Sequence, residues 1–170
     1  MTSPEPPSYS ANPDRDLDLD FDLVVEKEPP PDLGLAALSV LVPFILRAEH
    51  AAGPWVVAVA LVADDRLRAL HRDFMGLDTP TDVMTFPAED DGASARTRGG
   101  DIVVSVDRAT DQAPDFAHTP AEEIRFLVVH GLLHLCGWDD LTPADRARML
   151  ARQTQLLAAF EVACNAGPRP

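Results

Sequence analysis

The sequence has only two cysteines, Cys136 and Cys164. Two are too few for a disulfide framework, so we expect no disulfide and a cytoplasmic protein. Long apolar runs are also scarce. The longest, residues 33–46, is interrupted by Pro43 and is shorter than the roughly 20 residues that a membrane span needs. The first residues resemble neither a secretory signal nor a transit peptide. We therefore expect no membrane association.

Basic residues are few. The chain has 14 Lys and Arg against 28 Asp and Glu, a formal net charge of −14. Such a balance usually argues against a nucleic-acid partner, because phosphate binding relies on cations. Residues 1–32 carry nine acids against Arg15 and Lys27, which gives −7 for this segment and leaves −7 for the other 138 residues. The milder acidity of the rest of the chain does not exclude a local basic groove.

The length and a hydrophobic content of 46% predict one domain with flanking tails. We interpret residues 1–18 as a disordered acidic, proline-rich tail, residues 19–163 as the domain and residues 164–170 as a C-terminal tail.

The apolar patterns predict an α+β fold, or a layered α/β arrangement, with a small sheet of about four strands covered by helices. Asp64 and Asp65 are expected to cap the second helix. Thr119-Pro120-Ala121-Glu122 forms a capping box that opens the third helix, and Thr142-Pro143-Ala144-Asp145 opens the fourth. The expected strands are residues 19–26, 55–62, 81–87 and 101–106, and the expected helices are residues 33–50, 66–74, 120–137 and 143–162.

One stretch of the third helix, HGLLHLCGWDD (130–140), predicts a metal site. His130 and His134 share one helix face because they are four residues apart. Gly137 can end the helix in a left-handed conformation and return the chain, so that Asp140 reaches both imidazoles. Two imidazoles and a carboxylate suit zinc and leave a fourth position open, as in catalytic sites. We therefore expect a zinc site at the end of this helix.

Other interpretations of this stretch stay open. A pair of histidines at this spacing also arises by chance, as surface or core residues. Metallopeptidases with H-E-x-x-H use the glutamate after the first histidine as general base, but Gly131 occupies that position here. Cys136 lies on nearly the opposite helix face, which favours packing over a ligand role.

Four stretches together resemble the YbeY family of bacterial endoribonucleases and rRNA maturation factors. They are LRALHRDFMGLDTPTDVMTFP (67–87), GGDIVVS (99–105), EEIRFLVVHGLLHL (122–135) and HGLLHLCGWDD. The resemblance spans roughly residues 20–162. It implies one zinc ion per chain, held by His130, His134 and Asp140, and cleavage of single-stranded RNA. It also implies processing of the 16S rRNA 3′ end and quality control of the small ribosomal subunit.

The sequence departs from the family pattern at three positions. Asp140 stands where the third ligand is usually histidine, which keeps a zinc-compatible donor but lowers the positive charge of the site. Met75 stands where the family frequently has an arginine, and Arg72, one turn earlier, could take over the role of that arginine. His71 stands where the family has an asparagine.

Several side chains are candidates for the reaction and for RNA binding. Asp139 is a candidate base or imidazole-orienting residue, with helix capping as its alternative. Asp82 is a further candidate, with strand-end hydrogen bonding as its alternative. Trp138 is a candidate for stacking an RNA base near the metal, with packing over the helix end as the favoured alternative. His118 is a candidate for approaching the site, with solvation as the favoured alternative. The candidate phosphate contacts are Arg72, which is also a candidate catalytic residue, Arg96, Arg98 and Arg125.

Three functions therefore compete. The leading hypothesis is a zinc-dependent endoribonuclease acting on an rRNA precursor. The second is a metallopeptidase with the same ligand spacing, and the third is a ribosome-assembly factor with a non-catalytic zinc.

Overall fold

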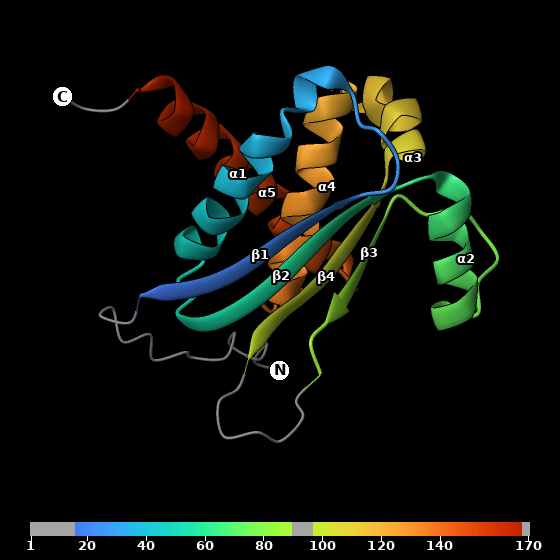
Figure 1. Cartoon of the computed structure of the whole chain (residues 1–170), viewed down its shortest axis with the longest axis horizontal. Helices are drawn as coiled ribbons and strands as arrows, with labels where there is room; N and C mark the ends of the chain where they lie inside the picture. Colours follow the sequence, from blue (N-terminus) through green and yellow to red (C-terminus); the bar gives the residue numbers. More distant parts are fainter. Residues whose placement is uncertain (1–15, 90–96, 168–170) are drawn as a thin grey trace.

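The computed structural model describes residues 16–89 and 97–167. Strands alternate with helices along most of the described chain (Figure 1). The elements are β1 (Leu17–Val25), η1 (Pro31–Leu33), α1 (Leu35–Ala48), β2 (Gly53–Val62), α2 (Asp64–Met75), β3 (Val83–Pro87), β4 (Arg98–Ser105), α3 (Val106–Gln112), η2 (Ala113–Phe116), α4 (Pro120–Leu135) and α5 (Pro143–Asn165).

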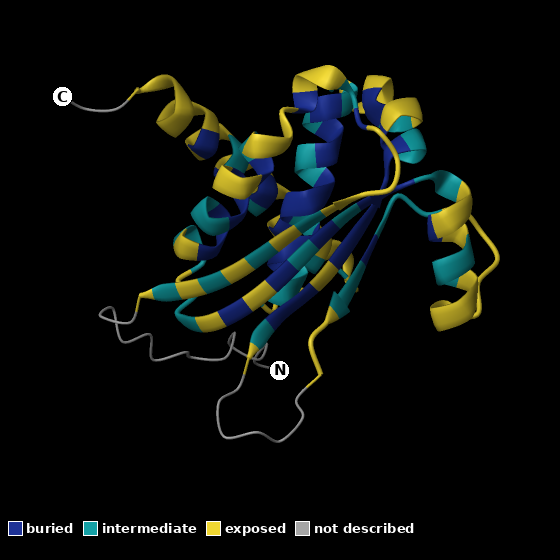
Figure 2. Ribbon diagram, viewed as in Figure 1, coloured by how far each residue is buried: buried dark blue, intermediate teal, exposed yellow. Residues whose placement is uncertain are grey.

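The strands form one four-stranded sheet in the order β1-β2-β4-β3. β1, β2 and β4 are parallel, and β3 is antiparallel to β4 at the edge. From Leu17 to Leu23 of β1, apolar residues alternate with aspartates, and in this stretch the aspartates are the exposed residues (Figure 2). The alternation fits an edge strand with one face on the core. The α+β prediction with about four strands is confirmed.

Helices cover both faces of the sheet. α1, α4 and α5 share one core with the face that carries Ile102 and Val104 of β4. Val103, which points to the other face, packs with Leu67 of α2. α4 is buried most deeply, between the sheet and α5 (Figure 2). Among the described helices, none combines the length and the apolar character needed to cross a bilayer.

The two predicted helix starts around the site are present. Thr119 and Glu122 form the reciprocal capping box of α4, and Thr142 accepts the backbone N–H of Asp145 at the start of α5. Gly137 follows the end of α4 with a φ of +96°, a conformation that glycine adopts at little cost. The chain therefore reverses where the sequence predicts it.

The predicted aspartate cap of α2 is wrong. The N-cap is Ala63, and the Asp64 carboxylate instead accepts hydrogen bonds from Ser105 and Arg108. Helix α3 and the turn η2 were not predicted, because seven residues are too few to show a helical period. The Ser105 side chain caps α3 by accepting the backbone N–H of Arg108.

Strand β4 begins three residues before its predicted start. Gly99 and Gly100 have φ angles of +110° and +146°. A Cβ atom at Gly99 would lie 2.0 Å from the Val56 carbonyl oxygen, and one at Gly100 would lie 2.1 Å from that of Phe86. The two glycines therefore let β4 pass between its neighbours, and they belong to the strand rather than to the preceding loop.

Candidate metal centre

Three of the predicted side chains converge at the end of α4. His130 and His134 lie one turn apart on the helix, and Asp140 approaches them from the loop before α5. The Nε2 atoms of the two imidazoles are 3.0 Å apart. Asp140 Oδ2 lies 3.6 Å from Nε2 of His130, and its Oδ1 lies 3.7 Å from Nε2 of His134. One donor atom from each residue fits within 4.8 Å of the others, so this cluster can hold a metal ion.

Both imidazoles are held at the nitrogen that faces away from the cluster. His130 Nδ1 lies 3.2 Å from Gln153 Oε1, and His134 Nδ1 lies 3.0 Å from the backbone carbonyl of Trp138. The Gln153 amide nitrogen donates to the Phe126 carbonyl, which fixes the oxygen as the atom facing His130. Each Nδ1 therefore donates its proton, and the Nε2 lone pair is left for a metal.

The loop that returns Asp140 is anchored by Glu49, the residue after α1. Its carboxylate accepts the indole N–H of Trp138 at 2.8 Å and the Nε–H of Arg152 at 2.7 Å. The Trp138 ring also packs against the main core. This contact favours the packing interpretation of Trp138, and the anchor places Asp140 beside the imidazoles.

The electrostatic surroundings favour a neutral His130. Burial lowers the pKa of His130, and the charge of His134 lowers it further. The hydrogen bond to Gln153 and the charges of Asp140 and Asp82 act in the opposite direction without reversing the shift. Neutral imidazole is the form that binds a metal. The three side chains are about a quarter to a third exposed, so solvent and substrate can reach them.

Gly131 faces the sheet rather than the cluster. A Cβ atom there would lie 2.7 Å from Cγ2 of the buried Ile102, so no larger side chain fits without displacing β4 or α4. The missing glutamate of the peptidase motif therefore has a packing cause. Cys136 is outside the cluster, and burial, with a smaller effect of Glu49, raises its pKa to about 12.

Of the predicted RNA contacts in the described residues, Arg72 lies away from the cluster. Arg72 lies on α2, across the sheet from α4, and pairs with Asp73 at 3.2 Å. Arg125 donates to the Leu33 carbonyl at 3.4 Å, and Arg98 begins β4. Arg96 lies outside the described residues. Asp139 lies beside Asp140, exposed, and accepts the Leu141 N–H at 3.0 Å. Their roles in catalysis and RNA binding stay predictions.

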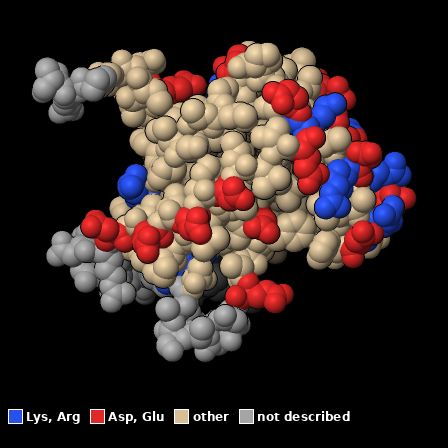
Figure 3. Space-filling model, in the orientation of Figure 1, with Lys and Arg blue, Asp and Glu red and all other residues tan. Residues whose placement is uncertain are grey.

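On the face shown in Figure 3, the basic side chains of the described residues form no continuous strip. Most of them gather near one end of the molecule, interspersed with acidic ones. Several described arginines form ion pairs: Arg66 with Glu26, Arg68 with Asp78, Arg72 with Asp73 and Arg108 with Asp64.

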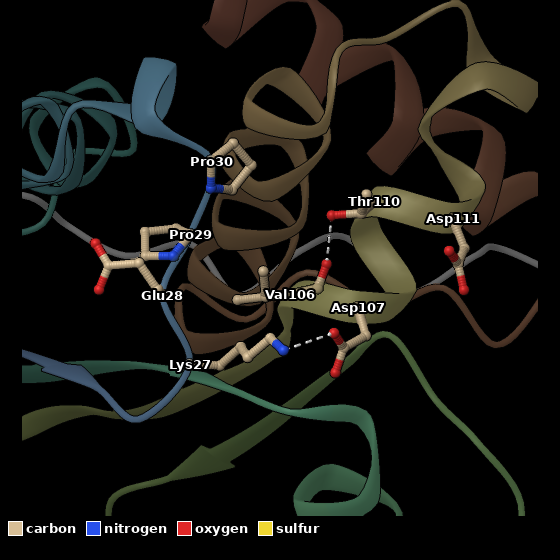
Figure 4. A pocket seen from close by; sticks show the side chains of 8 residues that line it. All are labelled: Lys27, Glu28, Pro29, Pro30, Val106, Asp107, Thr110 and Asp111. Carbon is tan, nitrogen blue, oxygen red and sulfur yellow. Dashed lines mark hydrogen bonds and ion pairs between the residues drawn. The ribbon is translucent and has the colours of Figure 1, made fainter.

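A surface hollow of about 410 Å³ lies elsewhere, between the segment after β1 and α3 (Figure 4). Lys27 reaches across it to Asp107, at 3.4 Å. No residue of the metal-ligand cluster lines it, so it does not extend the site.

Sequence reasoning missed the residues that orient the ligands. Gln153 is 2% exposed and stands in the apolar row Met149, Leu156 and Phe160 of α5. A polar residue at a core position of a helix was the available indication. Glu49 had no comparable indication, since it lies about 90 residues from Trp138 in the sequence.

The sequence model of the family Endoribonuclease YbeY matches residues 35–161, which include His130, His134 and Asp140. The chain belongs to the YbeY endoribonuclease family. An endoribonuclease YbeY of Roseiflexus sp. is 41% identical over 122 residues, which are 68% of this chain and 76% of the relative. That of Chloroflexus aurantiacus is 39% identical over 139 residues, 74% of this chain and 89% of the relative.

A solved structure has a similar fold. The solution structure of a Thermotoga maritima protein aligns with 88% of this chain and 94% of its own, at 26% identity and a TM-score of 0.60. The predicted family and the predicted fold are thereby confirmed.

Proposed function

We propose that this chain is a zinc-dependent, single-strand-specific endoribonuclease of the cytoplasm that processes the 3′ end of 16S rRNA and acts in quality control of the small ribosomal subunit. Membership of the YbeY family makes it a hydrolytic endoribonuclease whose substrate is RNA. The metal, the strand preference and the ribosomal role are the parts we propose. The convergence of His130, His134 and Asp140 carries the proposal.

The donor set fits zinc. Two imidazole nitrogens and a carboxylate oxygen match the ligands of catalytic zinc sites, which keep one position open. Zinc bound there would activate water and polarise a phosphoryl oxygen. Asp140, in place of the histidine of the family pattern, adds a negative charge, so we expect the same ligand number with a lower net positive charge.

The surrounding residues supply orientation. Gln153 and the Trp138 carbonyl hold the two imidazoles in the tautomer that presents Nε2. Asp139, next to a ligand and exposed to solvent, is our candidate for the group that accepts a proton during cleavage. The arginines Arg72, Arg96, Arg98 and Arg125 remain the candidate phosphate contacts.

The peptidase alternative lacks support in the geometry. Its general base would stand at Gly131, which packs against Ile102 and faces away from the cluster. A ribosome-assembly factor with a non-catalytic zinc differs from our proposal only in the absence of RNA cleavage, so the test must measure the metal and the reaction separately.

The first measurement is the metal content of the purified protein. We expect one equivalent of zinc in the wild type and in Asp139→Ala, whose carboxylate is adjacent but is not a ligand. We expect loss of the zinc in Asp140→Ala. Zinc retained in Asp140→Ala would refute this ligand set.

The second measurement is cleavage of a 16S rRNA precursor and of matched single-stranded and double-stranded RNA. We expect the wild type to cut the single strand and His134→Ala, matched for folding by circular dichroism, to be inactive. A zinc-loaded wild type that leaves every RNA intact would favour the assembly factor, and cleavage of casein would favour the peptidase.

A further inference from the structure

A row of aromatic rings leads away from the metal centre along the start of α4. The ring centroids of His118 and Phe126 are 5.5 Å apart, and those of Phe116 and His118 are 6.3 Å apart. Phe116 is 60% exposed, and the His118 side chain is 30% exposed. Three neighbouring rings are thus partly open to solvent.

This aromatic row, Phe116, His118 and Phe126, is continuous with the metal centre. Phe126, His130 and His134 are spaced by four residues on α4 and so follow one helix face, with a rise of about 6 Å between neighbours. Gln153 joins the two parts, because it accepts from His130 and donates to the Phe126 carbonyl. A chain bound at the metal centre can therefore extend over the rings.

The His118 ring is fixed by a buried polar network. Its Nδ1 lies 2.6 Å from a carboxylate oxygen of Glu123, which is 1% exposed. The Gln112 amide donates to the other oxygen of Glu123 at 2.7 Å and to Asp82 at 3.0 Å. Between the rings, Ala117 adopts a φ of +56°, which is uncommon for alanine. The His118 ring is thus held in place rather than left to rotate.

Stacking suits an acidic protein that acts on RNA. Arg125 of α4 donates to the Leu33 carbonyl, and the family arginine is replaced by the exposed Met75. Unpaired RNA bases stack on exposed aromatic rings, including histidine, with little dependence on base identity. We propose that the aromatic row binds the bases of single-stranded RNA next to the scissile phosphate. This inference rests on the proposed function and names the substrate contact of the same site.

Binding of a short fluorescein-labelled single-stranded oligoribonucleotide to the full-length protein, with a chelator present to prevent cleavage, tests the proposal. We expect Phe116→Ala to raise the Kd about 10-fold, since one stacked base is lost. Phe116→Tyr keeps a ring and should bind within about 2-fold of the wild type. Phe74→Ala is the matched control, because Phe74 is similarly exposed, at 66%, but lies on α2, and its Kd should not change.

A second arm uses an oligonucleotide with the same phosphates but without bases. The wild type should bind it at least as weakly as Phe116→Ala binds the intact RNA, because every stacked base is then missing. Equal affinity of the wild type and Phe116→Ala for intact RNA would overturn the proposal. The proposal would also be overturned if Phe116→Ala weakened binding of the strand without bases by the same factor as binding of intact RNA. A zinc-loaded wild type that cannot cut RNA, with the Phe116 dependence of binding intact, would refute the proposed function alone.

Discussion

Replacing Gln153 by leucine should weaken metal binding without removing any ligand. Gln153 is 2% exposed, and its carbonyl holds His130 through Nδ1 at 3.2 Å. Loss of such an orienting contact typically costs 10- to 100-fold in metal affinity, or about 1.4–2.7 kcal/mol. The orphaned N–H of His130 should in addition lower the free energy of unfolding by about 1–3 kcal/mol.

Urea unfolding with and without zinc distinguishes the loss of metal affinity from the loss of stability of the metal-free protein. If free zinc is at about 1,000 times the wild-type Kd, it stabilises the wild type by about 4 kcal/mol, and a 100-fold weaker site gains only about 1.4 kcal/mol. Gln153→Glu keeps an oxygen facing the imidazole and should retain affinity within a few fold. A folded Gln153→Leu protein that binds zinc as tightly as the wild type in a chelator competition would refute the orienting role.

Three further changes test other parts of the structure. Glu49→Ala removes the acceptor that Trp138 and Arg152 share. It should lower the free energy of unfolding by about 2–3 kcal/mol in urea titrations, because Arg152 loses its carboxylate partner and the indole N–H of Trp138 loses its acceptor. An unchanged urea midpoint would contradict the anchor. Gly131→Ala should lower the free energy of unfolding by about 1–2 kcal/mol in the same assay, because overpacking against Ile102 outweighs the gain in helix propensity. A variant more stable than the wild type would contradict the close packing of α4 against β4. Iodoacetamide at pH 8 should modify the exposed Cys164 of the native protein. Cys136, whose pKa burial raises to about 12, should react about 1,000-fold more slowly, as measured by mass spectrometry. Equal rates at the two cysteines would contradict the burial of Cys136.

The parts of the fold that the sequence predicted are governed by local physics. The capping box at Thr119 and the glycine at 137 act within a few residues, so the limits of α4 could be predicted to within two residues. The convergence of the three candidate ligands could be predicted for the same reason, because two of them are a helical turn apart and the third follows a single reversal.

Contacts between distant segments could not be predicted in this way. The order β1-β2-β4-β3 places the antiparallel strand β3 at one edge of the sheet. The apolar pattern of residues 83–87 does not indicate which strand β3 pairs with. Glu49 and Gln153 act on the site from α1 and α5, and only the packed structure brings them to α4. The capping role expected of Asp64 failed because Ser105 and Arg108, some 40 residues later, compete for its carboxylate.

The aspartates of β1 also bear on how copies of the protein meet in solution. β1 forms one edge of the sheet, and Asp18, Asp20 and Asp22 alternate along its exposed side. A second β1 strand aligned against this edge would set carboxylates opposite carboxylates, which disfavours pairing. We therefore expect this edge to resist pairing with a second copy of the chain.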